Sequence, residues 1–379
     1  SMEVDDQGRI LLTLTEADRY FASNLDVPII KADSDSDGLP IGSGRYELIA
    51  NYVEPYLSVN PRWSLGETPA ISLIYLRETP SQDTLQYNVR TGTVSYAYFD
   101  LSGDSSISSV SSATLPVVTN NLVFLGINSS SGLLAQPELR RALSGAINRE
   151  TVISEGYADR GWLAQTPFNP SFYALLEAEE TPAISSRSVA EQLLDTLGYD
   201  TIDASGLRIN GWGNTISLSI LVNEDNEERV QAADAIASQL RLSGIDATVE
   251  TCSYSDYLTR ITEGNFELYL GEISLLANMD LSPLLTGSTA ASGVSGQEDL
   301  IVRYETMREG RLSLTNFIDA FSRSMPFVPI CYRSGTVAYS RFITGDVTAT
   351  VHDIYLNIEQ WGYDDADTLG SSQSSDNDD

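Results

Sequence analysis

The stretch from Ile216 to Glu272, ISLSILVNEDNEERVQAADAIASQLRLSGIDATVETCSYSDYLTRITEGNFELYLGE, decides the fold. It opens with apolar residues at alternating positions, the period-two pattern of a strand with two unlike faces: Ile216, Leu218, Ile220 and Val222. Apolar residues then recur at helical spacing from Val230 to Leu240, until Gly244 supplies a residue suited to the left-handed end of a helix. The pattern predicts a strand followed by an amphipathic helix.

The rest of this stretch repeats the pattern. Residues 245–251 alternate again, Ser253 or Ser255 is placed to cap a short helix that Gly264 ends, and residues 266–270 make a third strand. Strand, helix, strand, helix, strand implies right-handed crossovers and a mixed or parallel sheet with helices on its faces. In such open sheets ligands bind at the carboxyl ends of the strands, so we expect function there.

The composition bounds the class of protein. A chain of 379 residues favours two domains, and no run of residues approaches the ~18 apolar residues of a membrane span. The net charge of −31 opposes binding to nucleic acid or to anionic lipid. The acidity is explained either by solubility or by attraction of cationic ligands.

Residues that carry metal or catalytic chemistry are few. Cys252 and Cys331 lack a CxxC partner and are either two buried thiols or one disulfide, and His352 is the sole histidine. The segment from Asp33 to Gly38 imitates the start of a calcium loop, but Gly44 stands where the loop needs a bidentate glutamate, so a solvated acidic loop is the alternative. We predict no catalytic residue, no metal and no cofactor.

Several short motifs together resemble a known family. They occur in the family's order: GSGRYEL at 42–48, NPRW at 60–63, FLGINSSSG at 124–132, LRRALSGAINRETVI at 139–153, AEQLLDTLGYD at 190–200 and VPICYRSGTVAY at 328–339. The sequence resembles the family 5 extracellular solute-binding proteins of ABC transporters, which include dipeptide, oligopeptide and nickel-chelate receptors. Arg45 and Asn148 depart from the family, which usually has Pro and Asp there.

The resemblance implies an α/β protein with the two-lobe architecture of periplasmic binding proteins, type II, cluster C, with mixed sheets. Residues 1–120 would begin lobe I, residues 121–332 would form lobe II, and residues 333–363 would return to lobe I, with a hinge at Leu125–Asn128 and Val328–Arg333. The acidic tail 364–379 is expected to be disordered. The family's amino-terminal segment is missing before Ser1, as is a signal sequence, so we expect an incomplete first lobe and a processed or engineered start.

The resemblance also implies a function and a site. The protein would be a non-enzymatic, monomeric receptor, either a cell-surface lipoprotein or periplasmic, that passes a peptide or similar small solute to the permease subunits of an ABC importer. Asp280 would hold the ligand's ammonium group, with a loop-structuring aspartate as the alternative. Four further residues are candidates for ligand contact: Asn278, Trp162, Tyr254 and Trp212. For the three aromatic residues, packing in the core is the alternative.

Two other functions are alternatives to this one. The first is a truncated or degenerate receptor that acts as an interaction or sensor module, which the missing amino-terminal segment suggests. The second is a hydrolase, which the absence of G-x-S-x-G, H-E-x-x-H and phosphate-loop motifs disfavours.

Overall fold

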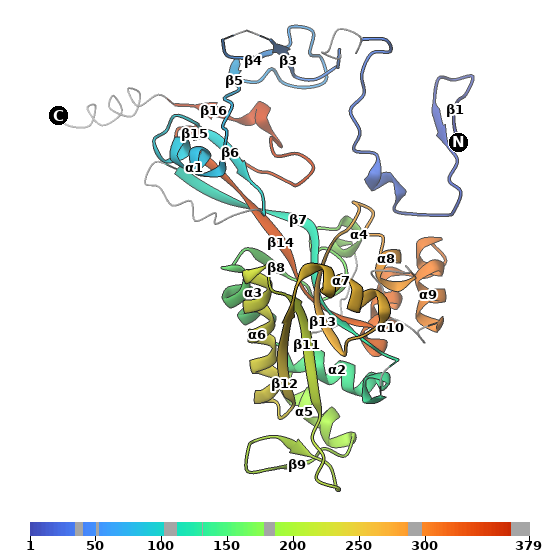
Figure 1. Ribbon diagram of the computed structural model, residues 1–379. Helices are drawn as coiled ribbons and strands as arrows, with labels where there is room; N and C mark the ends of the chain where they lie inside the picture. The colour runs from blue at the N-terminus through green and yellow to red at the C-terminus, as the bar shows by residue number, and fades with distance from the viewer. Residues whose placement is uncertain are drawn as a thin grey trace, which may run out of the picture. The chain divides into compact units, whose positions relative to one another are not determined.

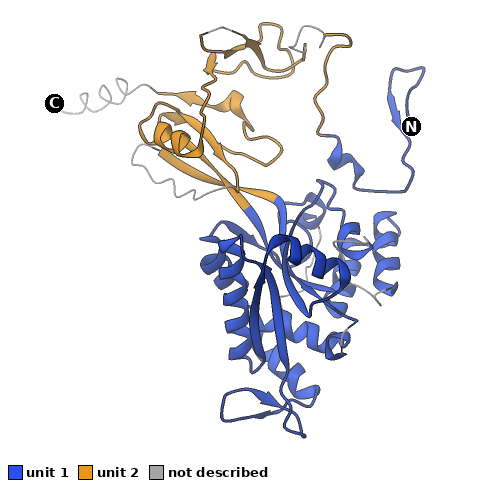
Figure 2. Ribbon diagram, viewed as in Figure 1, with its two compact units in different colours: residues 1–25, 120–333 blue, residues 26–119, 334–379 orange. Residues whose placement is uncertain are grey.

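The computed structural model of the protein describes residues 1–34, 41–50, 53–101, 112–130, 132–177, 186–286 and 298–364. The chain forms two compact units, the first made of residues 1–25 and 120–333 and the second of residues 26–119 and 334–379 (Figure 2). It passes between them after residues 25, 119 and 333. The lobe boundaries stay a prediction, and the predicted disordered tail lies outside the described residues from 365 onward.

Residues 216–274 form three neighbouring strands at one side of the first unit's sheet, with the helices that connect them. Their five elements follow the predicted order: β11 (Ser217–Asn223), α6 (Glu227–Leu242), β12 (Asp246–Cys252), α7 (Tyr254–Glu263) and β13 (Leu268–Ser274). Strand β11 lies between the other two strands and pairs in parallel with both. The predicted succession of elements is confirmed.

Gly244 and Gly264 follow the ends of these helices as the sequence indicated, and Ser253 is one of its two predicted caps. Helix α6 begins at Glu227, before the apolar run that the sequence indicated. Asn226 caps α6, because its Oδ1 accepts the N–H of Arg229 at 2.9 Å. Ser253 caps α7 in the same way. Gly244, after α6, and Gly264, after α7, have φ of +87° and +72°, backbone conformations in which a glycine is not strained.

Two long strands complete the main sheet of the first unit. Strand β7 (Ser112–Ile127) runs antiparallel to β13, and β14 (Phe327–Ser340) is the next strand in the order β12-β11-β13-β7-β14 (Figure 1). The short strand β8 (Gly161–Leu163) pairs antiparallel with β14. Parallel and antiparallel pairs therefore occur in one sheet, which confirms the mixed α/β fold.

Helices pack around this sheet. The closest pairs are α2 with α5, α3 with α6 and α9 with α10. The helix bounds are α2 (Pro137–Ala146), α3 (Arg149–Tyr157), α4 (Tyr173–Leu176), α5 (Arg187–Thr196), α8 (Ser282–Leu285), α9 (Glu298–Arg308) and α10 (Leu314–Ser324). The smaller elements of this unit are the strands β1 (Met2–Val4), β2 (Ile10–Leu12), β9 (Thr201–Ile202) and β10 (Arg208–Ile209), and 3-10 helices at Phe21–Asn24 and Gly132–Ala135.

Two glycines let aromatic rings lie flat across β7 and β13. Tyr269 is paired with Gly126, and Gly271 with Phe124, so each ring covers a glycine on the neighbouring strand. A Cβ added to Gly126 would lie 2.0 Å from Cε1 of Tyr269, a distance that real atoms do not reach. This pairing explains the glycine of the FLGIN motif by packing rather than by flexibility.

We expect Gly126→Ala to lower the free energy of unfolding by about 2–3 kcal/mol, because the buried Tyr269 ring must leave its position. Urea denaturation measures this loss. The matched control is Gly211→Ala, since no atom lies within 4 Å of a Cβ placed there and its backbone is not left-handed. Equal stability of the two variants would contradict the steric explanation.

The second unit has smaller cores. A three-stranded antiparallel sheet contains β3 (Tyr46–Ile49), β4 (Tyr56–Val59) and β5 (Leu73–Tyr75). Helix α1 (Gln82–Arg90) packs on β6 (Tyr96–Phe99), which pairs with the later residues of β14. Strands β15 (Ile343–Thr344) and β16 (Gly362–Tyr363) and a 3-10 helix (Ile358–Gln360) complete it around the buried Trp361.

Candidate functional site

Charged side chains gather at the carboxyl ends of the central strands of the first unit. Arg333 of β14 has a side chain only 3 % exposed, and its Nη2 lies 2.7 Å from Oε2 of Glu228. The other carboxylate oxygen of Glu228 pairs with Arg160, which follows α3. The ring of Tyr157, at the end of α3, lies 4.4 Å from the guanidinium carbon of Arg333. One carboxylate thus joins α6, β14 and the end of α3.

A second carboxylate, Glu272 near the end of β13, extends this network. Its Oε2 lies 3.7 Å from both Arg229 and Arg333, and its Oε1 accepts a hydrogen bond from the Asn121 side chain at 3.1 Å. Arg229 also donates to Oδ1 of Asn223, the last residue of β11. The carboxyl ends of β11 and β13 and the start of α6 are therefore fixed by ion pairs at the edge where open sheets bind ligands.

An apolar pocket of about 580 Å³ adjoins the network. We call it the Trp162 pocket; it is lined by Gly161, Trp162, Leu163, Gln165, Thr166, Phe168, Pro170, Leu175 and Leu176. Gly161 follows Arg160 and lies opposite Arg333 in the ladder between β8 and β14, and Trp162 lies opposite Tyr332. Trp162 is 44 % exposed, so its indole is accessible as pocket wall.

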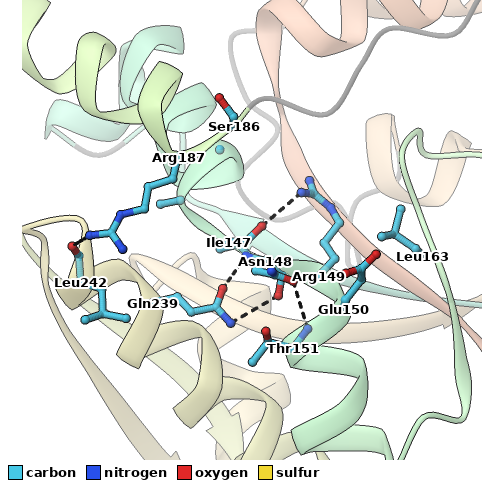
Figure 3. Close-up of a pocket in the computed structure, with 12 residues that line it drawn as sticks. Ile147, Asn148, Arg149, Glu150, Thr151, Leu163, Ser186, Arg187, Gln239 and Leu242 are labelled. Atoms are coloured by element: carbon cyan, nitrogen blue, oxygen red, sulfur yellow. Dashed lines mark hydrogen bonds between the residues drawn. The ribbon is translucent and has the colours of Figure 1, made fainter.

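A second pocket, of about 540 Å³, lies where α2 meets α3 (Figure 3). Its polar groups bond to one another: Asn148 caps α3 by accepting the N–H of Thr151 at 3.1 Å, and the Gln239 amide donates to the Asn148 carbonyl at 3.3 Å. Arg187 donates to the carbonyl of Leu242. Because these groups already serve the helix ends, the pocket has fewer free polar groups for a solute than its composition suggests.

Asp280, the predicted ammonium anchor, lies in the loop between β13 and α8. Its Oδ1 accepts the N–H of Ser282 at 2.9 Å, the Ser282 hydroxyl at 2.6 Å and the Tyr304 hydroxyl at 2.6 Å. Burial alone would raise the pKa of Asp280, but these hydrogen bonds outweigh it and hold the pKa below its usual value. Asp280 therefore structures this loop, and its other oxygen accepts no hydrogen bond from the described residues.

We expect Asp280→Asn to cost about 1 kcal/mol of folding free energy at pH 7, because neutral acceptors form weaker hydrogen bonds than carboxylates. A lowered folded-state pKa stabilises the protein above the unfolded-state pKa, and this stabilisation is lost as the pH falls through the folded-state pKa. The difference between wild type and variant should therefore shrink below about pH 4. Urea midpoints at pH 7, 5 and 3 measure it; a difference that stays constant would contradict the role of the ionised carboxylate.

The other predicted ligand residues lie in different surroundings. Asn278 is buried; its N–H donates to Asn24 and its side-chain amide to Asp18. Tyr254 begins α7 and is 52 % exposed. Trp212 is 88 % exposed in the turn between β10 and β11. It therefore precedes the amino end of β11, whereas the carboxyl end of β11 lies in the charged network. The fold brings Asn278 and Asp280 into one loop and places Trp212 at the opposite end of the sheet.

The cysteines and the histidine do not form a reactive cluster. Cys252 and Cys331 are both free thiols, and burial raises the pKa of Cys331 to about 12. His352 lies 3.3 Å from Asp26, and both side chains are exposed. Within the described ranges, no group of three or more His, Cys, Asp or Glu side chains is arranged to hold a metal ion, and the aspartates 35 and 37 of the calcium-like segment fall outside those ranges.

Sequence reasoning missed the network itself. Arg160, Glu228, Glu272 and Arg333 stand far apart in the chain, and no motif joins them. The only sequence signal for the network was the position of its carboxylates: Glu228 opens the helix after one predicted strand, and Glu272 lies at the end of another.

Among the described helices none is both long and apolar enough to cross a membrane.

A mixed-sheet α/β unit with an apolar pocket beside the carboxyl ends of its strands has the architecture of a small-molecule binding protein. Residues 1–293 match the family described as bacterial extracellular solute-binding proteins, family 5 Middle. The chain belongs to this family, as its motifs predicted.

Two curated relatives are similar over part of their length. The chain is 20 % identical over 257 residues to the oligopeptide-binding protein AppA of Bacillus subtilis, covering 66 % of this chain and 46 % of the relative. It is 22 % identical over 284 residues to heme-binding protein A of Haemophilus influenzae, covering 70 % and 50 %. The chain thus spans about half the length of the curated relatives it matches.

Solved structures share the fold. HbpA2 from Haemophilus parasuis superposes with a TM-score of 0.70 at 17 % identity, over 91 % of this chain and 72 % of that one. A peptide-binding protein AppA described as putative, from Clostridium difficile, gives 0.67 at 18 % identity, over 96 % and 78 %. The protein NikA from Brucella suis, in complex with Fe(III)-EDTA, gives a TM-score of 0.60 at 17 % identity, over 88 % of this chain and 71 % of that one. The periplasmic-binding-protein fold of the family 5 type is therefore confirmed.

Proposed function

We propose that the protein captures a peptide or similar small solute and delivers it to the permease subunits of an ABC importer. The observation that carries this proposal is the Trp162 pocket, an apolar recess next to the charged network at the carboxyl edge of the sheet, in a chain of the solute-binding family. The relative AppA of Bacillus subtilis is named as an oligopeptide-binding protein, which favours a peptide.

The backbone of β8 supports a peptide rather than a compact solute. The N–H of Ala164 donates to the carbonyl of Ile330 at 3.1 Å, and by antiparallel alternation Trp162 bonds to β14 in the same way. The peptide groups of Gly161 and Leu163 then point away from β14. Of the described strands only β14 pairs with β8, and we propose that an extended peptide adds to the other edge of β8.

The lining of the Trp162 pocket indicates what side chain it takes. Its walls are mostly aromatic and aliphatic, with Gln165 and Thr166 as polar neighbours, and none of its described lining residues is charged. A charged group placed there would lose water without gaining a partner, whereas an apolar one gains about 25 cal/mol for each Å² buried. We therefore assign to the pocket an apolar or aromatic side chain of the solute.

The remaining predicted contacts are kept as parts of this proposal. The oxygen of Asp280 that the loop does not use is available to a ligand ammonium group, and Asn278 and Tyr254 are tested with it by alanine substitution. Trp212, exposed at the other end of the sheet, is the weakest of these candidates and is tested below. The protein would act as a non-enzymatic monomer outside the cell, anchored as a lipoprotein or held in a periplasm. The family description, which is of extracellular solute-binding proteins, supports the location.

Isothermal titration with short peptides that carry one aromatic residue tests the proposal. Wild type should bind, and Trp162→Ala should weaken binding about 10-fold or more, because an aromatic wall of the pocket is lost. Trp212→Ala removes an indole at the other end of the sheet and is expected to weaken binding much less. Equal losses in the two variants would contradict the assignment of the pocket, and no binding across a varied peptide set would contradict the proposed function.

A further inference from the structure

An amino-terminal segment is fastened to the first unit next to the candidate site. We call residues Asp18–Asn24 the strap. Oδ2 of Asp18 lies 2.6 Å from Nη2 of Arg308, the last residue of α9, and accepts the Asn278 amide at 2.8 Å. Oδ1 of Asn24 accepts the backbone N–H of Asn278 at 3.0 Å. Both ends of the strap thus hold the loop that precedes Asp280.

Tyr20 anchors the middle of the strap. It is 2 % exposed, and its ring meets Phe172 edge-on, with the two ring centroids 5.2 Å apart. It also contacts Tyr173 at 6.3 Å, and the Arg308 guanidinium lies 5.7 Å from its ring centroid. An almost completely buried tyrosine in a segment without regular strand pairing indicates docking into a specific recess.

The surface under Tyr20 is the outer side of the Trp162 pocket wall. Phe172 stacks on Phe168 with centroids 6.0 Å apart, and Phe168 lines the pocket. Tyr173 begins α4, whose last residues, Leu175 and Leu176, line the pocket as well. Helix α4 has four residues, too few to be stable without packing, so its position depends on what lies against it.

We infer that Tyr20 is a positioning residue for the solute pocket: the docked strap holds Phe172 and α4 in place, and so sets the size of the recess that receives the solute side chain. This inference rests on the proposed function, because it concerns the same pocket. Since the strap and the solute lie against opposite sides of one wall, each favours the conformation that the other requires. By linkage, a strap that raises solute affinity is itself stabilised by the solute by the same factor.

The test uses titrations of Ala-Phe-Ala and Ala-Ala-Ala into wild type, Tyr20→Ala and Tyr20→Phe. Tyr20→Ala should weaken binding of Ala-Phe-Ala about 10-fold and that of Ala-Ala-Ala less than 3-fold, because a wall out of place harms the bulky side chain most. Tyr20→Phe keeps the ring and should restore both affinities. In wild type, Ala-Phe-Ala should slow hydrogen exchange of residues 18–24.

The matched control is Ile236→Val in α6, which destabilises the fold by removing a buried methyl group away from the pocket. It should leave the ratio of the two affinities unchanged. The inference would be overturned if Tyr20→Ala also left the ratio of the two peptide affinities unchanged. It would be overturned as well if Ala-Phe-Ala did not slow hydrogen exchange of the strap in wild type.

If wild type binds no peptide, the proposed function is contradicted, but the role of Tyr20 is not. That role can still be tested without ligand, by hydrogen exchange of the free protein. Residues 173–177 should exchange faster in Tyr20→Ala than in Ile236→Val if Tyr20 positions α4. Equal exchange rates in these two variants would overturn the inference.

Discussion

Removing salt is expected to destabilise this protein: transfer from 2 M to 0.05 M KCl at pH 7 should lower the melting temperature by about 10 °C or more. The chain carries 53 acidic and 22 basic residues and a net charge of −31, and folding brings these like charges together. The Debye length shrinks from roughly 14 Å at 0.05 M to about 3 Å at 1 M, so salt screens the repulsion between neighbouring carboxylates.

The shape of the salt dependence separates screening from a general strengthening of the hydrophobic effect. Screening changes most at low salt, so most of the gain in stability should occur below about 0.5 M. A stability that rises linearly up to 2 M, or that does not change, would contradict the electrostatic origin. Raising salt also weakens exposed ion pairs, for example Arg303 with Asp299, but such pairs contribute little to stability.

Local patterns predicted the centre of the fold because local physics decides it. The alternation from Ile216 to Val222 makes one face apolar, Gly244 and Gly264 supply left-handed backbone, and Ser253 supplies a cap, and each of these choices agrees with the structure. The pairing of β7 and β14 with this centre depends on contacts between distant parts of the chain. The residue patterns of β7 and β14 are those of strands, but they carry no signal for which strands these two pair with.

The site was predicted less well, for a related reason. Asp280 was recognised as a functional type of residue in a loop after a strand, but nothing in the sequence shows that Ser282 and Tyr304 take one of its oxygens. Trp162 was chosen only as an aromatic candidate, and its pocket depends on Leu175 and Leu176 in a different element. A sequence shows the type of each residue, but it does not show which residues contact each other in the folded protein.

Arg140→Met is expected to lower the free energy of unfolding by about 3–5 kcal/mol, a larger loss than that expected for Gly126→Ala. The Arg140 side chain lies inside the first unit, 1 % exposed, although arginine is almost never fully buried without partners. Its guanidinium donates to the carbonyls of Leu134 and Ala135 before α2 and to those of Ser324 and Met325 at the end of α10. Methionine replaces the aliphatic part of the arginine side chain but leaves these carbonyls without donors.

Arg141→Met is the control, since the neighbouring arginine of α2 is partly exposed and lacks hydrogen bonds to the described side chains and carbonyls. Its loss should stay within about 0.5 kcal/mol. Arg140→Lys should recover only part of the stability, because one ammonium group cannot reach carbonyls at both ends as a planar guanidinium does. Urea denaturation in 2 M KCl, where the charge repulsion is screened, measures all three variants. If Arg140→Met and Arg141→Met unfold at the same urea concentration, the guanidinium does not hold the start of α2 to the end of α10.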